Sequence, residues 1–113
     1  NAAGGVHVAA MGGLWQQVVM GFGGVRAKEE GLFLDPRLPS RWRSLEFPLD
    51  WRGCRLRVHV RRNRFLTVEV EGEKEKSVPV GIHGLAPMDL KAGCTYQSSW
   101  TGGAWSDLRE ADR

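Results

Sequence analysis

The sequence predicts a mainly β fold, a small antiparallel β-sandwich or barrel preceded by one α-helix. After Gly31, short apolar segments recur about every ten residues with glycines between them, which is typical of a sandwich or barrel rather than of βαβ units. Before Gly31, an uncharged apolar run extends from Val8 to Val25. The chain has 113 residues, which is room for one modest domain.

Residues 1–26 form the first predicted unit, with a helix over residues 7–22 that the glycine pair 23–24 ends. Apolar side chains fall on every side of this helix: Val8, Ala9, Met11, Leu14, Trp15, Val18, Val19, Met20 and Phe22. A helix that is apolar all round is buried in a soluble protein, yet nothing later in the sequence offers a second helix to cover it. We therefore expect the chain to be a piece of a larger protein.

A membrane span and a signal peptide are the rival interpretations of this segment. A transmembrane helix needs about 20 predominantly apolar residues, and Gln16, Gln17 and the glycines of this segment interrupt that pattern. A signal peptide has a basic region before its apolar run, which residues 1–5 lack. We therefore expect no membrane partner.

The next segments alternate between turns and short strands. Residues 28–31 form a polar turn, and residues 32–34 form a strand that ends before the first proline. Each proline removes a backbone donor and restricts the residue before it, so residues 35–39 cannot be regular. Residues 42–49 form another strand, in which Pro48 favours an edge or a bulge near the end.

The clearest strand pair spans residues 54–61 and 64–71. Its inward apolar residues are all even-numbered: Cys54, Leu56, Val58, Val60, Leu66, Val68 and Val70. Residues opposite one another share a face, so the connecting loop has an odd number of residues. A three-residue loop over 61–63, with Asn63 left-handed, satisfies this condition. The opposite pairs are then Val58–Leu66, Leu56–Val68 and Arg55–Glu69.

Further short strands are predicted over residues 78–82, 88–90 and 95–100. The remaining tail is polar apart from Trp105 and Leu108, and we expect it to be partly disordered. The predicted organisation is a helical segment at 1–26, a β-domain at 27–100 and a polar tail at 101–113.

Charge and cysteine content argue against several classes of protein. The formal net charge is only +3, and the densest basic run, residues 61–64, is one loop wide, so we interpret it as a solvated hairpin tip rather than a nucleic-acid site. Cys54 and Cys94 match no metal-ligand spacing. Cys54 shares the inward phase of its strand, so we expect two unbonded cysteines in a reduced, cytoplasmic setting.

Several motifs resemble a known family in their order along the chain. They are GVHVAAMGGLW at residues 5–15, GFGGVR at 21–26, LFLDPRLP at 32–39 and RGCRLRV at 52–58. In combination they closely resemble the last barrel helix and the carboxy-terminal domain of glycoside hydrolase family 65. The resemblance covers residues 1–97. The family contains inverting maltose, trehalose and kojibiose phosphorylases and a smaller set of hydrolases.

The resemblance implies an architecture and a set of partners. Family members carry an amino-terminal β-sandwich, an (α/α)6 barrel with the active site, and a small carboxy-terminal β-sheet domain. Residues 1–26 would supply the last helix of that barrel, where it would be buried, and residues 27–100 the carboxy-terminal β-sandwich. The implied partners are the remainder of the same enzyme, an α-glucosidic disaccharide and inorganic phosphate as co-substrate. The resemblance further implies a homodimer at full length, with no cofactor, metal or nucleic acid.

The implied reaction is direct displacement by phosphate at the anomeric carbon, which yields β-glucose 1-phosphate. A carboxylic acid protonates the leaving oxygen, as in inverting glycosidases, and phosphate replaces water. In the family that acid is a glutamate from the middle of the barrel, and no residue of this chain corresponds to it. The glutamates that fall on turns and strand faces are Glu29, Glu30, Glu46 and Glu69. We therefore expect no catalytic residue in this chain, which alone would be inert.

His7 is the candidate phosphate-binding residue. At the start of the predicted helix, backbone N–H groups and the helix dipole favour an anion, although a histidine that only fills a helix start is the alternative. The resemblance favours the anion site, because the matching histidine of the phosphorylases lies in their phosphate site. Gly5 would let the backbone approach the anion. Ala2 and Gly4 replace a threonine and a glutamate of many maltose-phosphorylase-like members, which leaves open the disaccharide and the choice between phosphorylase and hydrolase.

A non-catalytic carbohydrate-binding or structural β-module is the alternative function. Exposed tryptophans would form the sugar platform of such a module, and the candidates are Trp42, Trp51, Trp100 and Trp105. Packing in a core or an interface explains them as well. The apolar helix distinguishes the two hypotheses, because a free-standing module would not need it.

Overall fold

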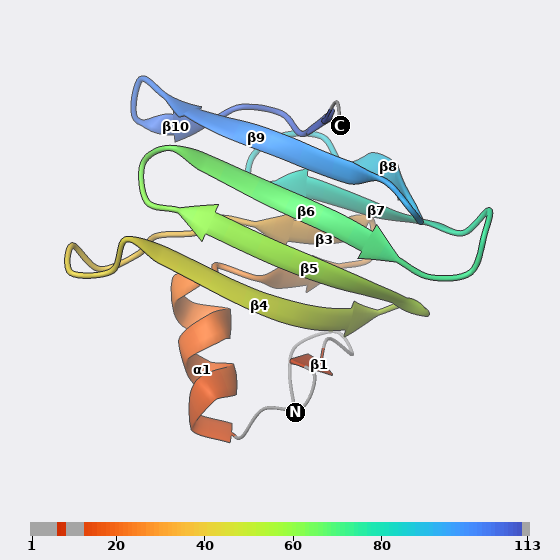
Figure 1. Ribbon diagram of the computed structural model, residues 1–113, viewed down its shortest axis with the longest axis horizontal. Coiled ribbons are helices and arrows are strands. Elements are labelled where there is room, and N and C mark those ends of the chain that lie inside the picture. The colour runs from red at the N-terminus through yellow and green to blue at the C-terminus, as the bar shows by residue number, and fades with distance from the viewer. Residues whose placement is uncertain (1–6, 9–12, 112–113) are drawn as a thin grey trace.

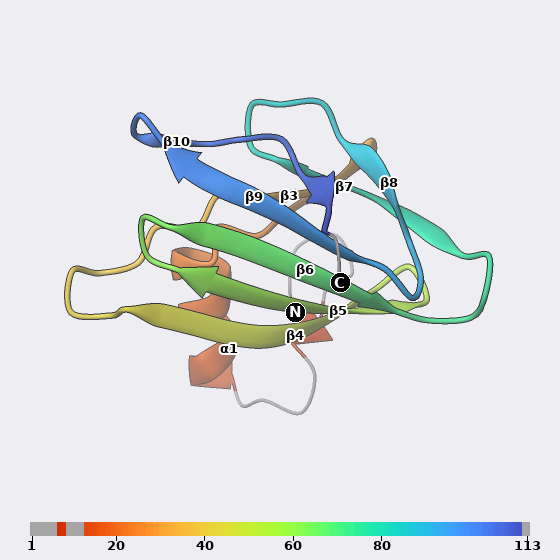
Figure 2. The same ribbon diagram turned by 45° about the horizontal axis from the view of Figure 1, so that its top comes forward.

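The computed structural model describes residues 7–8 and 13–111, with side chains described from Val18 onward. Two β-sheets pack face to face, and helix α1 (Gly13–Phe22) lies beside strand β4 of the larger sheet (Figures 1 and 2). The predicted mainly β fold, a small β-sandwich preceded by one helix, is confirmed.

The larger sheet is built around long antiparallel strands, which Figure 1 shows side by side in the order β4–β5–β6–β9. Their bounds are β4 (Ser44–Trp51), β5 (Cys54–Arg61), β6 (Phe65–Glu71) and β9 (Thr95–Thr101). Short strands extend both edges: β1 (His7–Val8) on β4, and β10 (Ala104–Trp105) and β11 (Arg109–Glu110) on β9. These additions cover backbone donors and acceptors that an open edge would leave unpaired.

The smaller sheet has the order β2–β3–β7–β8. Its strands are β2 (Arg26–Lys28), β3 (Gly31–Leu34), β7 (Ser77–Ile82) and β8 (Met88–Lys91). Strands β3 and β7 run parallel, so the sandwich is not antiparallel throughout. Parallel neighbours need a long crossover connection, and strands β4, β5 and β6 of the other sheet provide it.

The core lies between the inner faces of the two sheets. Strands β4 and β5 alternate buried and outward side chains, as the sequence predicts for a sheet with one face in the core. The opposite buried pairs of these strands are Leu45–Val60, Phe47–Val58, Leu49–Leu56 and Trp51–Cys54. Across the sandwich the smaller sheet buries Leu32, Leu34, Val78, Val80, Ile82 and Leu90.

In the central hairpin the predicted even-numbered side chains face the core, but the two strands pair in a different register. The observed opposite pairs are Val58–Val68, Leu56–Val70, Arg57–Glu69 and Arg55–Glu71. The predicted pairs Val58–Leu66, Leu56–Val68 and Arg55–Glu69 are therefore wrong. The loop is Arg62-Asn63-Arg64, one residue later than predicted, and Asn63 is left-handed as expected, with φ of 57°. A shift of two residues leaves the same side chains inside, so alternation alone cannot distinguish the two registers.

Helix α1 begins at Gly13 rather than at residue 7, and its C-terminal half packs on the sheet of this chain. Val19 is fully buried in the same core as the strands. Gly23, directly after the helix, lies so close to Phe47 that an added Cβ would be 3.0 Å from the ring. The prediction that nothing in this chain covers the helix is therefore wrong for this face, because β4 supplies the apolar surface. Phe22 remains 36% exposed.

The segment after Thr101, predicted as a partly disordered tail, packs on the larger sheet as far as it is described. Trp105 and Leu108 are buried in the core. The buried hydroxyl of Ser98 donates to the carbonyl of Ser106 at 2.6 Å, and the Ser106 hydroxyl accepts the Ser99 N–H at 3.0 Å. These contacts hold the segment on β9, which a polar composition does not reveal.

Gly24→Ala tests the close passage of the chain after the helix. Gly24 has φ of +62°, and a Cβ there would overlap the backbone carbonyl of Asp35. Gly102 has nearly the same φ, +61°, with open space around it. In both variants the alanine must adopt the left-handed backbone conformation, which costs the same free energy in each. Only the alanine at position 24 must also displace neighbouring backbone. Urea unfolding should therefore show Gly24→Ala to be about 1–3 kcal/mol less stable than Gly102→Ala. Equal losses would contradict the observed packing.

Candidate functional site

The structure places His7 on a sheet edge and not at the start of a helix. His7 in β1 is the backbone partner of Asp50 in β4, and Val8 is the partner of Leu49. The helix that was predicted to begin at His7 begins at Gly13, so the helix-dipole argument for an anion at His7 does not hold. The free edge of β4 offers hydrogen bonds to residues 7–8, which explains their extended conformation. Gly5 lies outside the described residues.

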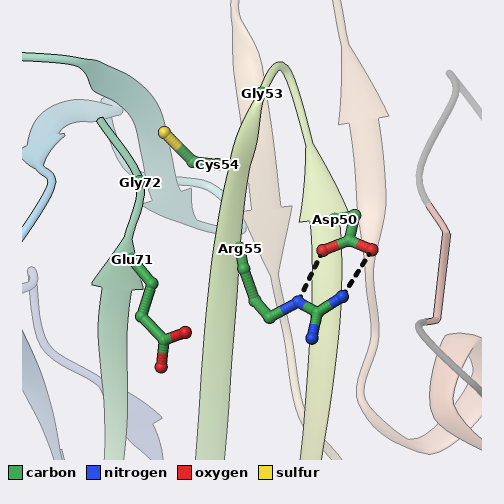
Figure 3. A pocket seen from close by; sticks show the side chains of 6 residues that line it. All are labelled: Asp50, Gly53, Cys54, Arg55, Glu71 and Gly72. Atoms are coloured by element: carbon green, nitrogen blue, oxygen red, sulfur yellow. Dashed lines mark hydrogen bonds and ion pairs between the residues drawn. The ribbon is translucent and has the colours of Figure 1, made fainter.

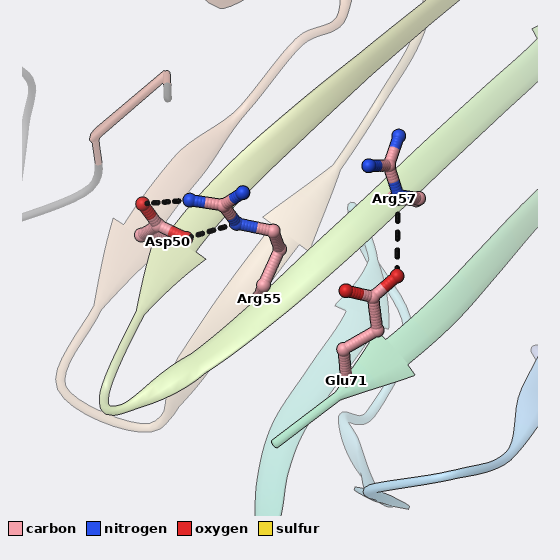
Figure 4. A network of polar contacts seen from close by, with 4 residues as sticks. All are labelled: Asp50, Arg55, Arg57 and Glu71. Carbon is pink, nitrogen blue, oxygen red and sulfur yellow. Dashed lines mark hydrogen bonds and ion pairs between the residues drawn. The ribbon is translucent and has the colours of Figure 1, made fainter. Parts of the chain in front are cut away.

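Asp50, the partner of His7, is held by an arginine on the neighbouring strand. Arg55 of β5 lies opposite Asp50 and donates two hydrogen bonds to its carboxylate, from Nε at 2.8 Å and from a terminal nitrogen at 3.1 Å (Figures 3 and 4). The hydrogen bond and the charge of Asp50 raise the pKa of Arg55. Both side chains are close to half exposed, so solvent screens the pair, whose role is geometric more than energetic.

A second ion pair lies on the same outer face. Arg57 donates from Nε to the carboxylate of Glu71 at 3.2 Å (Figure 4). The two pairs lie side by side across β4, β5 and β6. Within each pair the arginine and the carboxylate neutralise each other's charge. Sequence reasoning missed both pairs, because the first depends on the register of β4 with β5 and the second on the register of β5 with β6.

An open cavity of about 490 Å³ lies at the β4–β5 turn, between these charges. Its lining is Asp50, Gly53, Cys54, Arg55, Glu71 and Gly72 (Figure 3). The carboxylates of Asp50 and Glu71 both accept hydrogen bonds from arginines. Within residues 7–8 and 13–111, no three His, Cys, Asp or Glu side chains lie close enough to hold a metal ion.

The four candidate tryptophans serve as packing residues. Trp51 and Trp105 are buried, and Trp42 and Trp100 are half-buried. Trp42 meets Phe22 edge-on with 5.2 Å between ring centroids, and Trp100 meets Trp105 in the same way at 5.0 Å. An exposed platform of the kind that stacks on sugars is therefore not formed by these four rings together.

The glutamates of the β-domain lie where the sequence predicts. The side chains of Glu29 and Glu30 are exposed in a turn, and those of Glu46 and Glu69 are exposed on strands β4 and β6. These four carboxylates are therefore solvated. Helix α1 is too short to cross a membrane, and no other helix occurs in the described part of the chain.

Comparison with known proteins shows the family of this chain. The family model described as glycosyl hydrolase family 65, C-terminal domain, matches residues 25–85. Kojibiose phosphorylase of Halothermothrix orenii is 43% identical over 82 residues, which are 71% of this chain and 10% of that protein. Alpha,alpha-trehalose phosphorylase of Thermoanaerobacter brockii is 37% identical over 73 residues, which are 65% of this chain and 9% of that protein. The chain belongs to glycoside hydrolase family 65.

The fold has a counterpart among solved structures. A human-microbiome protein whose name links it to kojibiose phosphorylase superposes with a TM-score of 0.59 over 88% of this chain and 12% of that protein, at 21% identity. This likeness concerns the fold. The chain spans about a tenth of the length of the relatives that it matches, and its residues 25–85 match the model of the family's C-terminal domain.

Cys54 and Cys94 are free thiols with different surroundings. Cys54 is buried, and a Cβ added at Gly72 would be 3.1 Å from its Sγ, whereas Cys94 is only half-buried. In the native protein we expect a thiol reagent to modify Cys94 first and Cys54 only on unfolding, because the reagent needs access to the sulfur. The measurement is the time course of thiol modification with and without denaturant. Cys94→Ser should retain only the slow group, and a thiol count of zero in denaturant would contradict the free state of both.

Proposed function

We propose that this chain is the C-terminal part of an inverting α-glucosidic disaccharide phosphorylase. The observation that carries the proposal is the match to relatives named kojibiose phosphorylase and alpha,alpha-trehalose phosphorylase. Family members of this kind transfer a glucosyl group to inorganic phosphate and release β-glucose 1-phosphate. The substrates would be an α-glucosidic disaccharide and phosphate, without a further cofactor.

The chemistry of the complete enzyme follows from the inverting geometry. Phosphate attacks the anomeric carbon from the face opposite the leaving group, and a carboxylic acid protonates the glycosidic oxygen. Phosphate takes the place of water, so no base has to activate the nucleophile. The described carboxylates of this chain lie on turns, on strand faces or in ion pairs with arginine. We assign the acid to the remainder of the enzyme.

The role of this chain would be to complete the barrel and to position the phosphate. Helix α1 would be the last helix of the (α/α)6 barrel, with the partly exposed Phe22 on its uncovered side. The pairing of β1 with β4 ties the segment that carries His7 to the β-domain. His7 would donate a hydrogen bond to phosphate, and Gly5 would allow the backbone to approach it. We propose a cytoplasmic enzyme that forms a homodimer.

His7→Ala in the full-length enzyme tests the phosphate site. Loss of one hydrogen bond to a charged ligand costs about 1.5–3 kcal/mol, so the apparent phosphate constant should rise about ten- to a hundred-fold. Hydrolysis of a glucosyl fluoride needs no phosphate and should fall much less. The assay is initial rate against phosphate concentration with the natural disaccharide.

His83→Ala is the matched control, because His83 is an exposed histidine in the turn after β7. It should leave the phosphate constant unchanged. An unchanged constant in His7→Ala would refute the role of His7. A wild-type rate that does not depend on phosphate would refute the phosphorylase and indicate a hydrolase.

A further inference from the structure

The fold brings six arginines together at one end of the molecule. They come from the segment after β3 and from the β5–β6 hairpin tip: Arg37, Arg41, Arg43, Arg61, Arg62 and Arg64. The two segments touch, because the Arg62 N–H donates to the carbonyl of Arg43 at 2.8 Å. Of these six arginines, only Arg37 forms an ion pair within the described part of the chain, with Asp35 at 3.4 Å. The basic run therefore extends over more than the single loop that the sequence suggested.

A third segment closes the same end. The N–H of Trp100, near the end of β9, donates to the carbonyl of Arg64 at 2.9 Å. Trp105 of β10 stands against Trp100 with an interplanar angle of 70°. The two indoles thus form an apolar corner directly beside the arginine-rich tip.

A cavity of about 230 Å³ opens where the three segments meet. Its lining includes Arg37, Leu38, Arg62, Asn63, Trp100 and Trp105. The polar side chains of this lining donate hydrogen bonds, and no carboxylate lines it. The cavity is open to solvent, and its volume is sufficient for one sugar ring.

Arg62 carries a donor that the described part of the chain leaves unused. Its Nε is fully buried and has no hydrogen-bond partner among the described residues. The indole N–H of Trp105, in contrast, reaches the carbonyl of Pro36 at 3.4 Å. A buried donor without a partner is costly, and the same guanidinium belongs to the cavity lining, where its terminal nitrogens would bind an anionic oxygen.

We propose that this cavity binds a small anionic sugar, one hexose that carries a phosphate or a carboxylate group. The guanidinium of Arg62, with Arg37, would bind the anionic group, because arginine matches the geometry of both anions. Trp100, which is only half-buried, would pack on the apolar C–H face of the ring, with the buried Trp105 supporting it from behind. Neutral sugars lack the charge that the arginines need, and inorganic anions lack the ring.

The cavity lies far from His7. It adjoins Arg43, the residue before β4, whereas His7 pairs with Asp50 near the other end of that strand. The separation along β4 is about 20 Å. The two sites can therefore be tested independently, and the proposal does not rest on the phosphorylase activity.

Titration calorimetry of the intact protein at low salt tests the proposal with four probes: glucose 6-phosphate, glucuronate, glucose and inorganic phosphate. At least one of the two anionic sugars should bind, and the stronger of them identifies the anionic group. Glucose and inorganic phosphate should each bind at least tenfold more weakly. The anionic-sugar assignment would be overturned if glucose or inorganic phosphate bound with comparable affinity, or if neither anionic sugar bound.

The variants locate the site. Arg62→Gln should weaken binding of the anionic sugar about ten- to a hundred-fold. Arg37→Gln should weaken binding several-fold without disturbing the core, because the Arg37 side chain is 76% exposed. Arg57→Gln is the matched control with the same change of charge, since Arg57 pairs with Glu71 on the sheet face, and it should leave the affinity unchanged. An affinity lost in His7→Ala but kept in Arg37→Gln and Arg62→Gln would overturn the proposal.

Discussion

The structure depends on one ladder of buried apolar pairs across β4, β5 and β6. Val58 lies between Phe47 on one side and Val68 on the other, and all three are almost completely buried. Burial of each such side chain contributes about 1.5–3 kcal/mol. A shift of any of these strands by one residue would turn its inner face to solvent. Three further elements attach directly to this ladder: the end of α1 through the approach of Gly23 to Phe47, β9 through the Val68–Tyr96 pair, and β1 at the free edge of β4.

The edge of β4 links the β-domain to the segment that carries the candidate phosphate ligand. Residues 7–8 are held by backbone pairing with Leu49 and Asp50, and Arg55 fixes the carboxylate of Asp50. A segment held in this way has lost conformational freedom before any ligand arrives, so less entropy is lost on binding. In the proposed phosphorylase, the β-domain would thus contribute by positioning the neighbouring segment.

The opposite end of β4 has a different chemical character. There the chain brings arginines, two indoles and a cavity together, at the meeting point of segments that are separated by more than twenty residues in the sequence. None of these segments carries the feature alone. The hairpin tip is a short basic loop, and residues 100–105 are an ordinary turn with two aromatic side chains. The cavity arises only from the pairing of β5 with β4 and of β6 with β9.

The sequence by itself determined the alternation of β4, β5 and β6, the left-handed Asn63 and the end of the helix at the glycine pair, because each depends on periodicity or on local backbone sterics. It also carried the family motifs. The hairpin register, in contrast, follows from long-range packing, since two registers bury the same side chains. Tertiary contacts likewise placed His7 on the edge of β4, the tail on β9 through Ser98 and Ser106, and the helix against Phe47. These outcomes depend on contacts between residues distant in sequence, which no local pattern encodes.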